Sequence, residues 1–391
     1  MRRNDAFRTA LAGLLAMAAA IGIGRFVYTP IVPAMIVALG LSRSAAGLIA
    51  SANFVGYLLG ALVAAWPNLP GSRRAWLFGS LAVSGLTTAG MGLVHTMGAF
   101  VLLRFAGGSA SAVVLVLASA IVLEHLAQAR RAALSSLHFA GVGCGIVASA
   151  ALVAGLQVGG QDWSSLWEAS GIVSIGATAA VAVLLPQSVR LTRRTVQQGS
   201  WRADPALIRL AVAYGLFGFG YVITATFLVV IVRTTPSIGG LELVIWVVFG
   251  LAAAPSVAMW AWIASRLGTI ATFALACVVE ACGVLASVAW PGEAGAFLSA
   301  ILVGATFMGL TALGLVRARA LAAGDPRRVL ALMTSAFGLG QIVGPSFAGL
   351  LSDRFGSFAI PSTAAIVALL VAAGLVCLSP ETAADSRAVP R

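Results

Sequence analysis

The sequence predicts an all-α integral membrane protein in which twelve transmembrane helices form two six-helix pseudo-repeats. The first observation behind this prediction is the composition, since 60% of the residues are hydrophobic and only 9% are charged. A soluble domain carries roughly 25% charged residues. In lipid, only helices and closed barrels satisfy the backbone polar groups. The apolar runs of this chain are continuous and not alternating, so we expect helices.

The second observation is an internal duplication. The segments Ile21–Phe26 (IGIGRF) and Phe217–Val222 (FGFGYV) are similar and lie 196 residues apart in a chain of 391 residues. Two further pairs keep this offset to within one residue: Phe100 and Gly107 with Phe297 and Gly304, and Gly141-x-Gly143 with Gly338-x-Gly340. In a strongly apolar chain, such a duplication is typical of secondary transporters, whose substrate site lies between the halves near the bilayer midplane.

A membrane-spanning helix needs about 20 apolar residues, and this length predicts twelve spans. They are 8–37 (with Pro30 and Pro33 in its outer part), 45–66, 75–95, 98–123, 133–156, 166–186, 207–232, 242–263, 268–290, 295–317, 330–351 and 358–378. We therefore expect an N-terminal six-helix bundle over 1–186, a cytoplasmic linker over 187–206 and a C-terminal six-helix bundle over 207–391.

The net charge of +12 rests on arginine alone, because the chain has 24 basic residues and none is Lys. With the N-terminus inside, 19 of the 24 lie in inside segments, and the others are Arg25, Arg43, Arg104, Arg233 and Arg354. This bias predicts cytoplasmic termini in a multi-pass protein of the bacterial cell inner membrane. Tryptophans near predicted span ends are expected to form an interfacial belt: Trp66, Trp76, Trp163, Trp167, Trp260, Trp262 and Trp290.

The sequence contains no recognisable catalytic constellation. A phosphate-binding P-loop needs a Lys, so ATP-driven pumping by this chain is excluded, and neither metal-ligand nor nucleophile–base groupings are present. Basic residues do not gather on a soluble domain, so no nucleic-acid partner is expected. We predict that the chain is not an enzyme, needs no cofactor and acts as a monomer. Its expected partners are a small-molecule substrate, protons and membrane lipid.

The most informative residues are the ionisable ones inside spans, because a charge at the bilayer centre costs roughly 2.5–3.5 kcal/mol. Arg25 lies in the first span directly after the small residues Gly22 and Gly24, and its counterpart in the second repeat is Tyr221. The two halves therefore present different chemistry at one height, which suits a polar substrate with a charged end. The alternative is that Arg25 reaches the outer headgroups.

Arg104 in the fourth span has Ile301 as its counterpart, so the shared packing frame does not require it. We interpret it as a group for substrate binding or proton coupling, with a structural pair as the alternative. Glu280 in the ninth span is the only acid deep in a predicted span. It could carry a proton, although a fixed partner of an Arg or of a backbone group is favoured. Neutral polar residues complete the candidate substrate site, as ligand groups or as bonds between helices: Tyr28, Asn53, Tyr57, Tyr221, Thr224 and Gln341.

Over its whole length the chain resembles the major facilitator superfamily, with twelve spans in two halves. The segment Gly22–Pro33 (GIGRFVYTPIVP), followed by Ser51–Tyr57 (SANFVGY), resembles the bacterial YbfB/YjiJ-type branch. Arg104 with Gly107 and Gly108 is similar to the R-x-x-x-G motif of span 4, which that superfamily links to proton coupling. The resemblance implies that spans 1, 4, 7 and 10 line a cavity, and these spans carry Arg25, Tyr28, Arg104, Tyr221 and Thr224.

The chain departs from the superfamily pattern between spans 2 and 3. The usual loop reads G-x-x-x-D-R-x-G-R-R, but here only Arg73 and Arg74 match its basic end, so the acidic partner of the inner gate is missing. A fuller match, Gly349-x-x-x-Asp353-Arg354-x-Gly356, lies between spans 11 and 12 on the expected outside. There we expect a helix-terminal cap and an ion pair with no gating role.

We predict a secondary active transporter that moves a small organic anion, such as a carboxylate, by proton-coupled symport and alternating access. Two intramembrane Arg against one Glu leave a positive interior, which is the reason for an anion. Two alternatives remain open. The Gly-, Ala- and Leu-rich cavity and Glu280 would also suit proton-driven efflux of apolar or cationic compounds. A non-transporting membrane sensor on the same scaffold is the second alternative.

Overall fold

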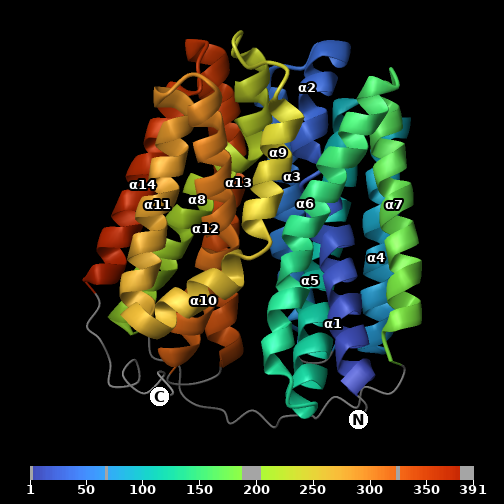
Figure 1. The fold of residues 1–391 in the computed structure, drawn as a ribbon, viewed down its shortest axis with the longest axis vertical. Helices are drawn as coiled ribbons and strands as arrows, with labels where there is room; N and C mark the ends of the chain where they lie inside the picture. Colours follow the sequence, from blue (N-terminus) through green and yellow to red (C-terminus); the bar gives the residue numbers. More distant parts are fainter. Residues whose placement is uncertain (1–2, 67–68, 187–203, 323–325, 379–391) are drawn as a thin grey trace.

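The computed structural model describes residues 3–66, 69–186, 204–322 and 326–378, and these ranges contain helices and no strand (Figure 1). The elements are α1 (Arg3–Met17), η1 (Ala18–Ile23, a π-helix), α2 (Tyr28–Leu39), α3 (Arg43–Ala64), α4 (Arg73–Gly90), η2 (Met91–Leu93), α5 (Met97–Gln128), η3 (Ala132–Leu134), α6 (Ser135–Val158), α7 (Trp163–Leu184), α8 (Pro205–Thr234), α9 (Glu242–Ala253), α10 (Ser256–Leu267), α11 (Thr269–Ala289), α12 (Glu293–Ala320), α13 (Pro326–Phe355) and α14 (Ala359–Cys377).

The predicted all-α fold is confirmed. Eleven segments of the described chain are long and apolar enough to cross a membrane, and there are twelve if the pair α9–α10, bent by 44°, is counted as one span. The first span is not one helix, since α1, η1 and α2 follow one another along it. The expected linker over 187–206 lies outside the described residues, apart from 204–206.

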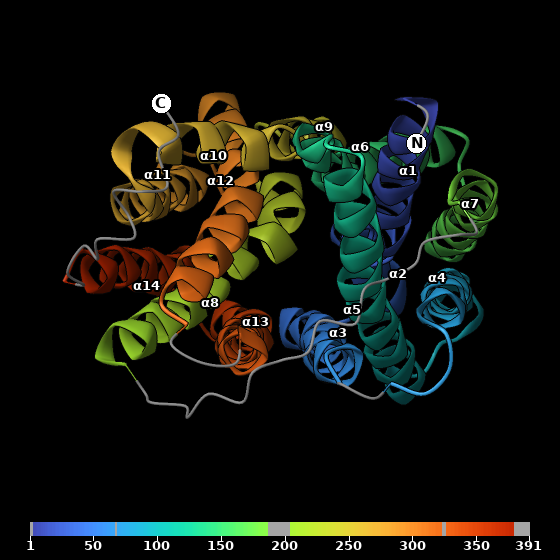
Figure 2. The ribbon, with the colours of Figure 1, turned by 90° about the horizontal axis from the view of Figure 1, so that it is seen from below.

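The helices form two groups (Figure 2). Helices α1–α7, called the first half below, lie on one side of the molecule, and α8–α14, the second half, lie on the other. The helix α1 begins and the helix α14 ends at the same end of the molecule, called the terminal end; the opposite end is called the distal end (Figure 1). The halves contact each other mainly through α3 with α13, α6 with α9 and α2 with α8.

Local sequence explains where several helices begin. A side-chain oxygen accepts a hydrogen bond from an otherwise unpaired backbone amide at five helix starts: Ser42, Ser72, Thr96, Asp162 and Asp204. Short oxygen-bearing side chains are favoured there because the first amides of a helix have no partner within it. Pro205 then occupies the first turn of α8, where its missing N–H costs nothing.

The duplicated Gly-x-Gly segments serve equivalent helix contacts in the two halves. A Cβ on Gly141 in α6 would collide with the Leu14 carbonyl oxygen of α1. A Cβ on Gly340 in α13 would collide with the Gly215 carbonyl oxygen of α8. Since only glycine permits such backbone approach, the fifth span packs on the first as the eleventh packs on the seventh.

The expected belt of tryptophans is wrong for three of its members, since Trp163, Trp167 and Trp260 are buried. Trp260 Nε1 donates to the Ala305 carbonyl oxygen at 2.7 Å and so joins α10 to α12. These rings lie near helix ends in the sequence, but neighbouring helices cover them. The residues that do stay exposed near helix ends are Trp66, Trp262 and Trp290.

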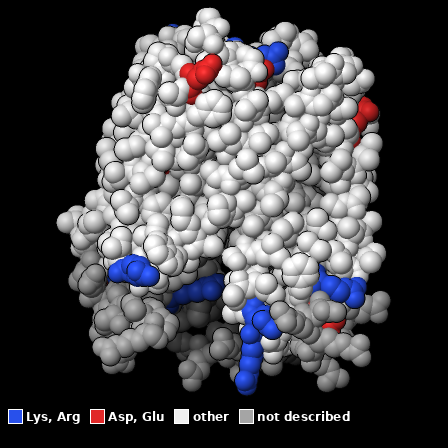
Figure 3. Space-filling view, in the orientation of Figure 1, with Lys and Arg blue, Asp and Glu red and all other residues white. Residues whose placement is uncertain are grey.

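The surface is consistent with a membrane environment. In the view of Figure 3, a wide band around the middle of the molecule is almost free of charged side chains, and arginines gather at the terminal end. In the same view the surface is hollowed between the two halves at the terminal end. At the distal end the two halves are in contact, as described below.

Candidate functional site

Where the first span is interrupted, two backbone carbonyl oxygens have no hydrogen-bond donor within the helix. Residues Gly24 to Val27 form a turn between η1 and α2. Pro30 has no N–H to offer the Phe26 carbonyl, which accepts a bond from the Thr29 amide at 3.2 Å instead. Such breaks are tolerated at membrane depth only where other groups satisfy the freed backbone.

Arg104 supplies those groups. From α5 its Nη1 donates to the Gly24 carbonyl oxygen at 3.0 Å and its Nη2 to the Arg25 carbonyl oxygen at 3.1 Å. The guanidinium also lies 5.0 Å from the Tyr28 ring and 5.9 Å from the Trp167 ring. Arg104 is therefore held inside the first half, against the broken helix.

Two further candidate residues belong to this joint. The Asn53 Nδ2 donates to the Arg104 carbonyl oxygen at 2.9 Å and ties α3 to α5. The Tyr28 hydroxyl donates to the Ala46 carbonyl oxygen at 2.7 Å and ties α2 to α3. Both therefore act as bonds between helices in this structure, one of the two roles expected from the sequence.

Gly108, the glycine of the span-4 motif, allows α3 and α5 to approach closely. A Cβ at this position would collide with the carbonyl oxygen of Asn53. Arg104 and Gly108 thus lie one turn apart on α5, with the glycine bringing α3 close enough for the Asn53 amide to reach Arg104. In this structure the R-x-x-x-G segment joins α5 to α3 and to the first span.

Arg25 lies in a different environment, at the contact between the halves. Its Nη2 donates to the Tyr221 hydroxyl of α8 at 3.1 Å. The guanidinium also lies 4.4 Å from the Phe54 ring centre, 4.7 Å from that of Tyr57 and 5.3 Å from that of Phe26. Aromatic faces attract a cation at these distances, so the first half presents Arg25 to the second in an aromatic cage.

The second half supplies polar and aromatic groups around the same point. The Gln341 amide Nε2 of α13 donates to the Tyr221 hydroxyl, which thus joins Arg25 to Gln341. The Gln341 Oε1 has no hydrogen-bond partner among the described residues. One turn along α8 from Tyr221, the buried Thr224 hydroxyl also has none within the described ranges.

An aromatic cluster that the sequence analysis missed covers Tyr221. The Tyr221 ring stacks on Phe307 of α12 at 5.6 Å and on Phe337 of α13 at 5.8 Å. Phe26 of the first half meets Phe307 edge-on at 5.7 Å. A signal was available, because Phe337 directly precedes the duplicated Gly-x-Gly and Phe307 lies one turn after the matched Gly304.

The charges around this centre do not balance. Arg25 is 6% exposed and Arg104 is 5% exposed, and the Nε atom of each has no hydrogen-bond partner in the described chain. Neither forms an ion pair with an acidic residue of the described ranges, since their bonds go to carbonyl and hydroxyl oxygens. A buried charge without a counter-ion costs several kcal/mol.

Glu280 lies in the second half, close enough to Tyr221 for an electrostatic interaction. It is fully buried in α11, which packs on α12 and α14 of the second half. Neither carboxyl oxygen has a hydrogen-bond partner among the described residues. The fixed pairing with an Arg or backbone group that the sequence analysis favoured is therefore absent from the described part of the chain.

The structure thus divides the candidate residues into three sets. Arg25, Tyr57, Tyr221 and Gln341 come together where the halves meet, with Thr224 one turn away. Tyr28, Asn53 and Arg104 form the joint inside the first half. Glu280 is buried inside the second half, within electrostatic range of Tyr221.

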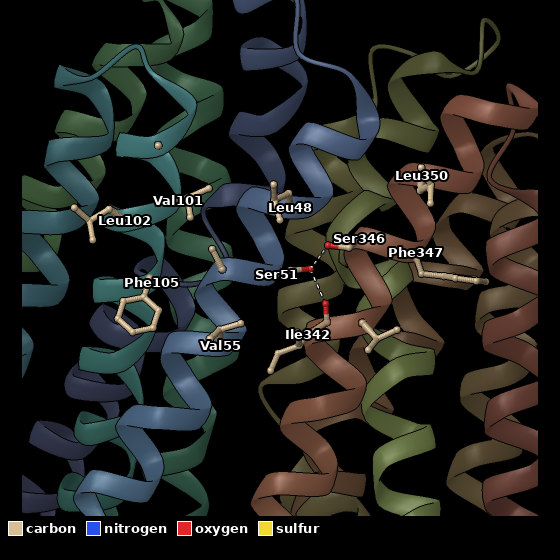
Figure 4. Close-up of a pocket in the computed structure, with 13 residues that line it drawn as sticks. Leu48, Ser51, Val55, Val101, Leu102, Phe105, Ile342, Ser346, Phe347 and Leu350 are labelled. Atoms are coloured by element: carbon tan, nitrogen blue, oxygen red, sulfur yellow. Dashed lines mark hydrogen bonds between the residues drawn. The ribbon is translucent and has the colours of Figure 1, made fainter.

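A separate groove of about 860 Å³ lies between α3, α5 and α13 (Figure 4). Both hydroxyl groups that line it already donate hydrogen bonds within the protein. Ser346 donates to Ser51 at 2.8 Å, and Ser51 donates to the Ile342 carbonyl oxygen at 2.7 Å. The other lining residues, among them Leu48 and Phe105, offer no polar side chain. This groove therefore lacks a group that would hold an anion.

Comparisons with known proteins agree with the fold. Residues 17–377 match the family described as "Uncharacterised MFS-type transporter YbfB". A search of curated proteins finds no match. Among solved structures, a bacterial homolog of the human lysosomal transporter Spinster, in an inward-facing and occupied conformation, is similar with a TM-score of 0.75 and 16% identity over 97% of each chain.

A mutant of the nucleoside transporter NupG is also similar, with a TM-score of 0.69 and 14% identity over 95% of this chain and 97% of that one. At these identities the similarity concerns the fold. The family match covers most of the chain, and it confirms the prediction of a membrane transporter that is not an enzyme. The chain belongs to the YbfB-type family of major facilitator superfamily transporters.

Proposed function

We propose that this protein is a secondary transporter that moves a small organic anion, such as a carboxylate, by proton-coupled symport and alternating access. The observation that carries the proposal is the pair of buried guanidiniums, Arg25 and Arg104, without an acidic partner among the described residues. An arginine stays charged under all physiological conditions. A bound carboxylate would supply the missing counter-charge.

Arg25 is the group we assign to the anion. Its contacts are one hydroxyl and three aromatic faces, and these leave N–H donors for a two-pronged bond to a carboxylate. The Tyr221 hydroxyl and the free Gln341 Oε1 would orient the rest of the ligand. Because these groups come from both halves, the substrate would couple the halves as they rock.

Arg104 contributes in a different way in this proposal. Both of its Nη atoms already bond to carbonyls of the broken first span. It therefore holds the backbone of Arg25 in place and adds positive charge to the same region. Its assignment as a direct ligand is the weaker of the two roles predicted from the sequence.

Glu280 is the residue we assign to proton coupling. It is the one acid that is fully buried among the described residues, and its carboxyl oxygens have no hydrogen-bond partner there. A carboxyl that is buried in one state and reached by water in another can take up and release a proton. The alternative of cation efflux would use the same acid, but Arg25, at the contact between the halves, would repel a cation.

We place the terminal end in the cytoplasm of a bacterial inner membrane. The support is the gathering of arginines at that end (Figure 3), which is the distribution that the positive-inside rule describes. In this orientation the hollow between the halves faces the cytoplasm and the closed distal end faces outward.

The test is a ligand screen on the purified protein in lipid nanodiscs. Carboxylates, organic cations and neutral compounds are compared by thermal unfolding at an acidic and a neutral pH. A ligand at a hundred times its Kd adds about 2.7 kcal/mol to the stability. We expect carboxylates to stabilise, and a hit to be taken up by proteoliposomes when a proton gradient is imposed. Stabilisation by cations alone would establish the efflux alternative, and binding without any flux would establish the sensor.

A further inference from the structure

At the distal end a carboxylate of the second half caps a helix of the first half. Asp353, near the end of α13, accepts the Arg43 amide at 3.0 Å on one oxygen and the Ser44 amide at 2.8 Å on the other. These amides are the first two of α3, which belongs to the opposite half. The third amide, of Ala45, bonds to the Ser42 hydroxyl within the first half at 3.0 Å. The N-terminus of α3 is thus capped jointly by both halves.

This cap is energetically favourable only while the halves touch. The first amides of a helix have no partner within it, and a carboxylate there gains both hydrogen bonds and attraction to the positive end of the helix dipole. If the distal end opened, the amides of Arg43 and Ser44 would have to bond to water instead, and the Asp353 carboxylate would lose the dipole.

Further contacts between α3 and α13 follow one another along the two helices, starting from this cap. The Arg43 side chain donates from Nη1 to the Ser352 carbonyl oxygen at 3.2 Å. A Cβ on Gly47 of α3 would collide with the Pro345 carbonyl oxygen of α13. Further along, Ser346 donates to Ser51 (Figure 4). The helices therefore touch closely at several successive levels, and Asp353 lies at the end of the row nearest the distal surface.

We propose that Asp353 is a gating residue of the transport cycle, which holds the distal end closed by capping a helix of the opposite half. This assignment differs from the cap without a gating role that the sequence suggested, because the capped helix is α3 and not a helix of the same half. The proposal rests on alternating access as proposed above, but it does not depend on the identity of the substrate.

The chain offers a matched control. Asp162 caps α7, where its Oδ1 accepts the Ser165 amide at 3.0 Å and the Ser164 hydroxyl at 2.9 Å. Asp162 and α7 both belong to the first half, and the cap lies at the distal end like that of Asp353. Loss of the Asp162 carboxylate therefore weakens a helix start without changing any bond between the halves.

The experiment measures the opening of the distal end directly. Spin labels are placed on cysteines at the exposed positions Gln161 and Ser237, one in each half, in a background without the four native cysteines. Distances between the labels are recorded by pulsed electron resonance in nanodiscs for the parent, Asp353→Asn, Asp353→Ala, Asp353→Glu and Asp162→Asn. No substrate is needed, so failure of the anion proposal would not affect this measurement.

We expect Asp353→Asn and Asp353→Ala to raise the ratio of distal-open to distal-closed molecules by roughly 2- to 30-fold, the factor that corresponds to the usual contribution of a helix cap. Asp353→Glu should fall between them and the parent, and Asp162→Asn should match the parent. If Asp353→Ala does not fold, the Asn and Glu variants give the same comparison. An unchanged distribution in the Asp353 variants, or an equal shift in Asp162→Asn, would overturn the gating role.

Discussion

Arg25 and Tyr221 hold the same place in the two repeats, 196 residues apart, and they are bonded to each other at 3.1 Å. The neighbouring positions repeat this relationship, since the Thr29 hydroxyl donates to the carbonyl oxygen of its counterpart Ala225 at 2.8 Å. Equivalent residues can meet in this way only close to the axis that relates the halves. The repeat therefore brings a guanidinium of one half against a phenol of the other at the centre of the molecule.

Replacing Arg25 tests its role as the anion anchor. Arg25→Met keeps the length of the side chain and removes the charge, so we expect the Kd of a carboxylate ligand to rise roughly 10- to 100-fold, the range for a charged hydrogen bond. Calorimetric titration measures this change. Arg266→Met is the control. Arg266 also lies against an aromatic ring, 5.1 Å from that of Trp262, but it belongs to α10 and lies outside the proposed anion site. Equal Kd values for the Arg25 variant and the parent would remove Arg25 from the site.

The Tyr221 hydroxyl can be removed without disturbing the ring stack. Tyr221→Phe should raise the KM for uptake several-fold, because Arg25 and Gln341 lose the oxygen that joins them. Tyr214→Phe is the matched control, since the Tyr214 ring also stacks on Phe337 while its hydroxyl bonds to a carbonyl within the second half. Uptake kinetics in proteoliposomes distinguish the two variants, and an equal effect of both would point to packing alone.

Arg104 should matter more for stability than for affinity. Arg104→Met leaves the Gly24 and Arg25 carbonyls without their donors, and we expect the free energy of unfolding to fall by about 1–3 kcal/mol, the usual cost of leaving a buried acceptor unsatisfied. Denaturant unfolding in lipid or detergent measures it. Arg104→Lys should recover part of the loss. A stable Arg104→Met protein with weakened ligand binding would instead make Arg104 a direct ligand.

Gly108 provides a second test of the joint between α3 and α5. Gly108→Ala would force the backbone of α5 away from the Asn53 carbonyl, and overpacking of this kind costs typically 1–3 kcal/mol. Gly98→Ala on the same helix is the control, because no atom lies within 4 Å of a Cβ built there. We expect a lower unfolding temperature for the first variant only; two equally stable proteins would contradict the close packing.

Glu280→Gln separates proton coupling from substrate movement. The amide keeps the size of the carboxyl but cannot exchange a proton, so uptake driven by a proton gradient should stop while exchange of labelled for unlabelled substrate continues. The control is Glu293→Gln, at the exposed distal start of α12. Gradient-driven uptake that survives in the Glu280 variant would exclude this residue as the proton carrier.

Much of the architecture could be predicted from local sequence. The length of each apolar run predicted the spans, and the structure confirms eleven of them, with α9–α10 as the twelfth if this bent pair is one span. The prolines of the first span were visible, but the π-helix η1 before them and the role of Arg104 in serving the exposed carbonyls were not. The reason is that a proline that interrupts a helix is visible in the sequence, whereas the donor that satisfies the freed carbonyl oxygen belongs to a residue some 80 positions away.

The sequence by itself determined the class of the molecule, since its scarcity of charge requires a lipid environment and its duplication requires two similar halves. Only the tertiary structure decided what the charged residues do. It separated Arg25 at the contact between the halves from Arg104 inside one half, and it placed the Asp353 carboxylate of α13 against the first amides of α3 in the opposite half. Apolar length is a property of each segment alone, but the partner of a buried polar group depends on how helices distant in sequence rotate and pack against one another.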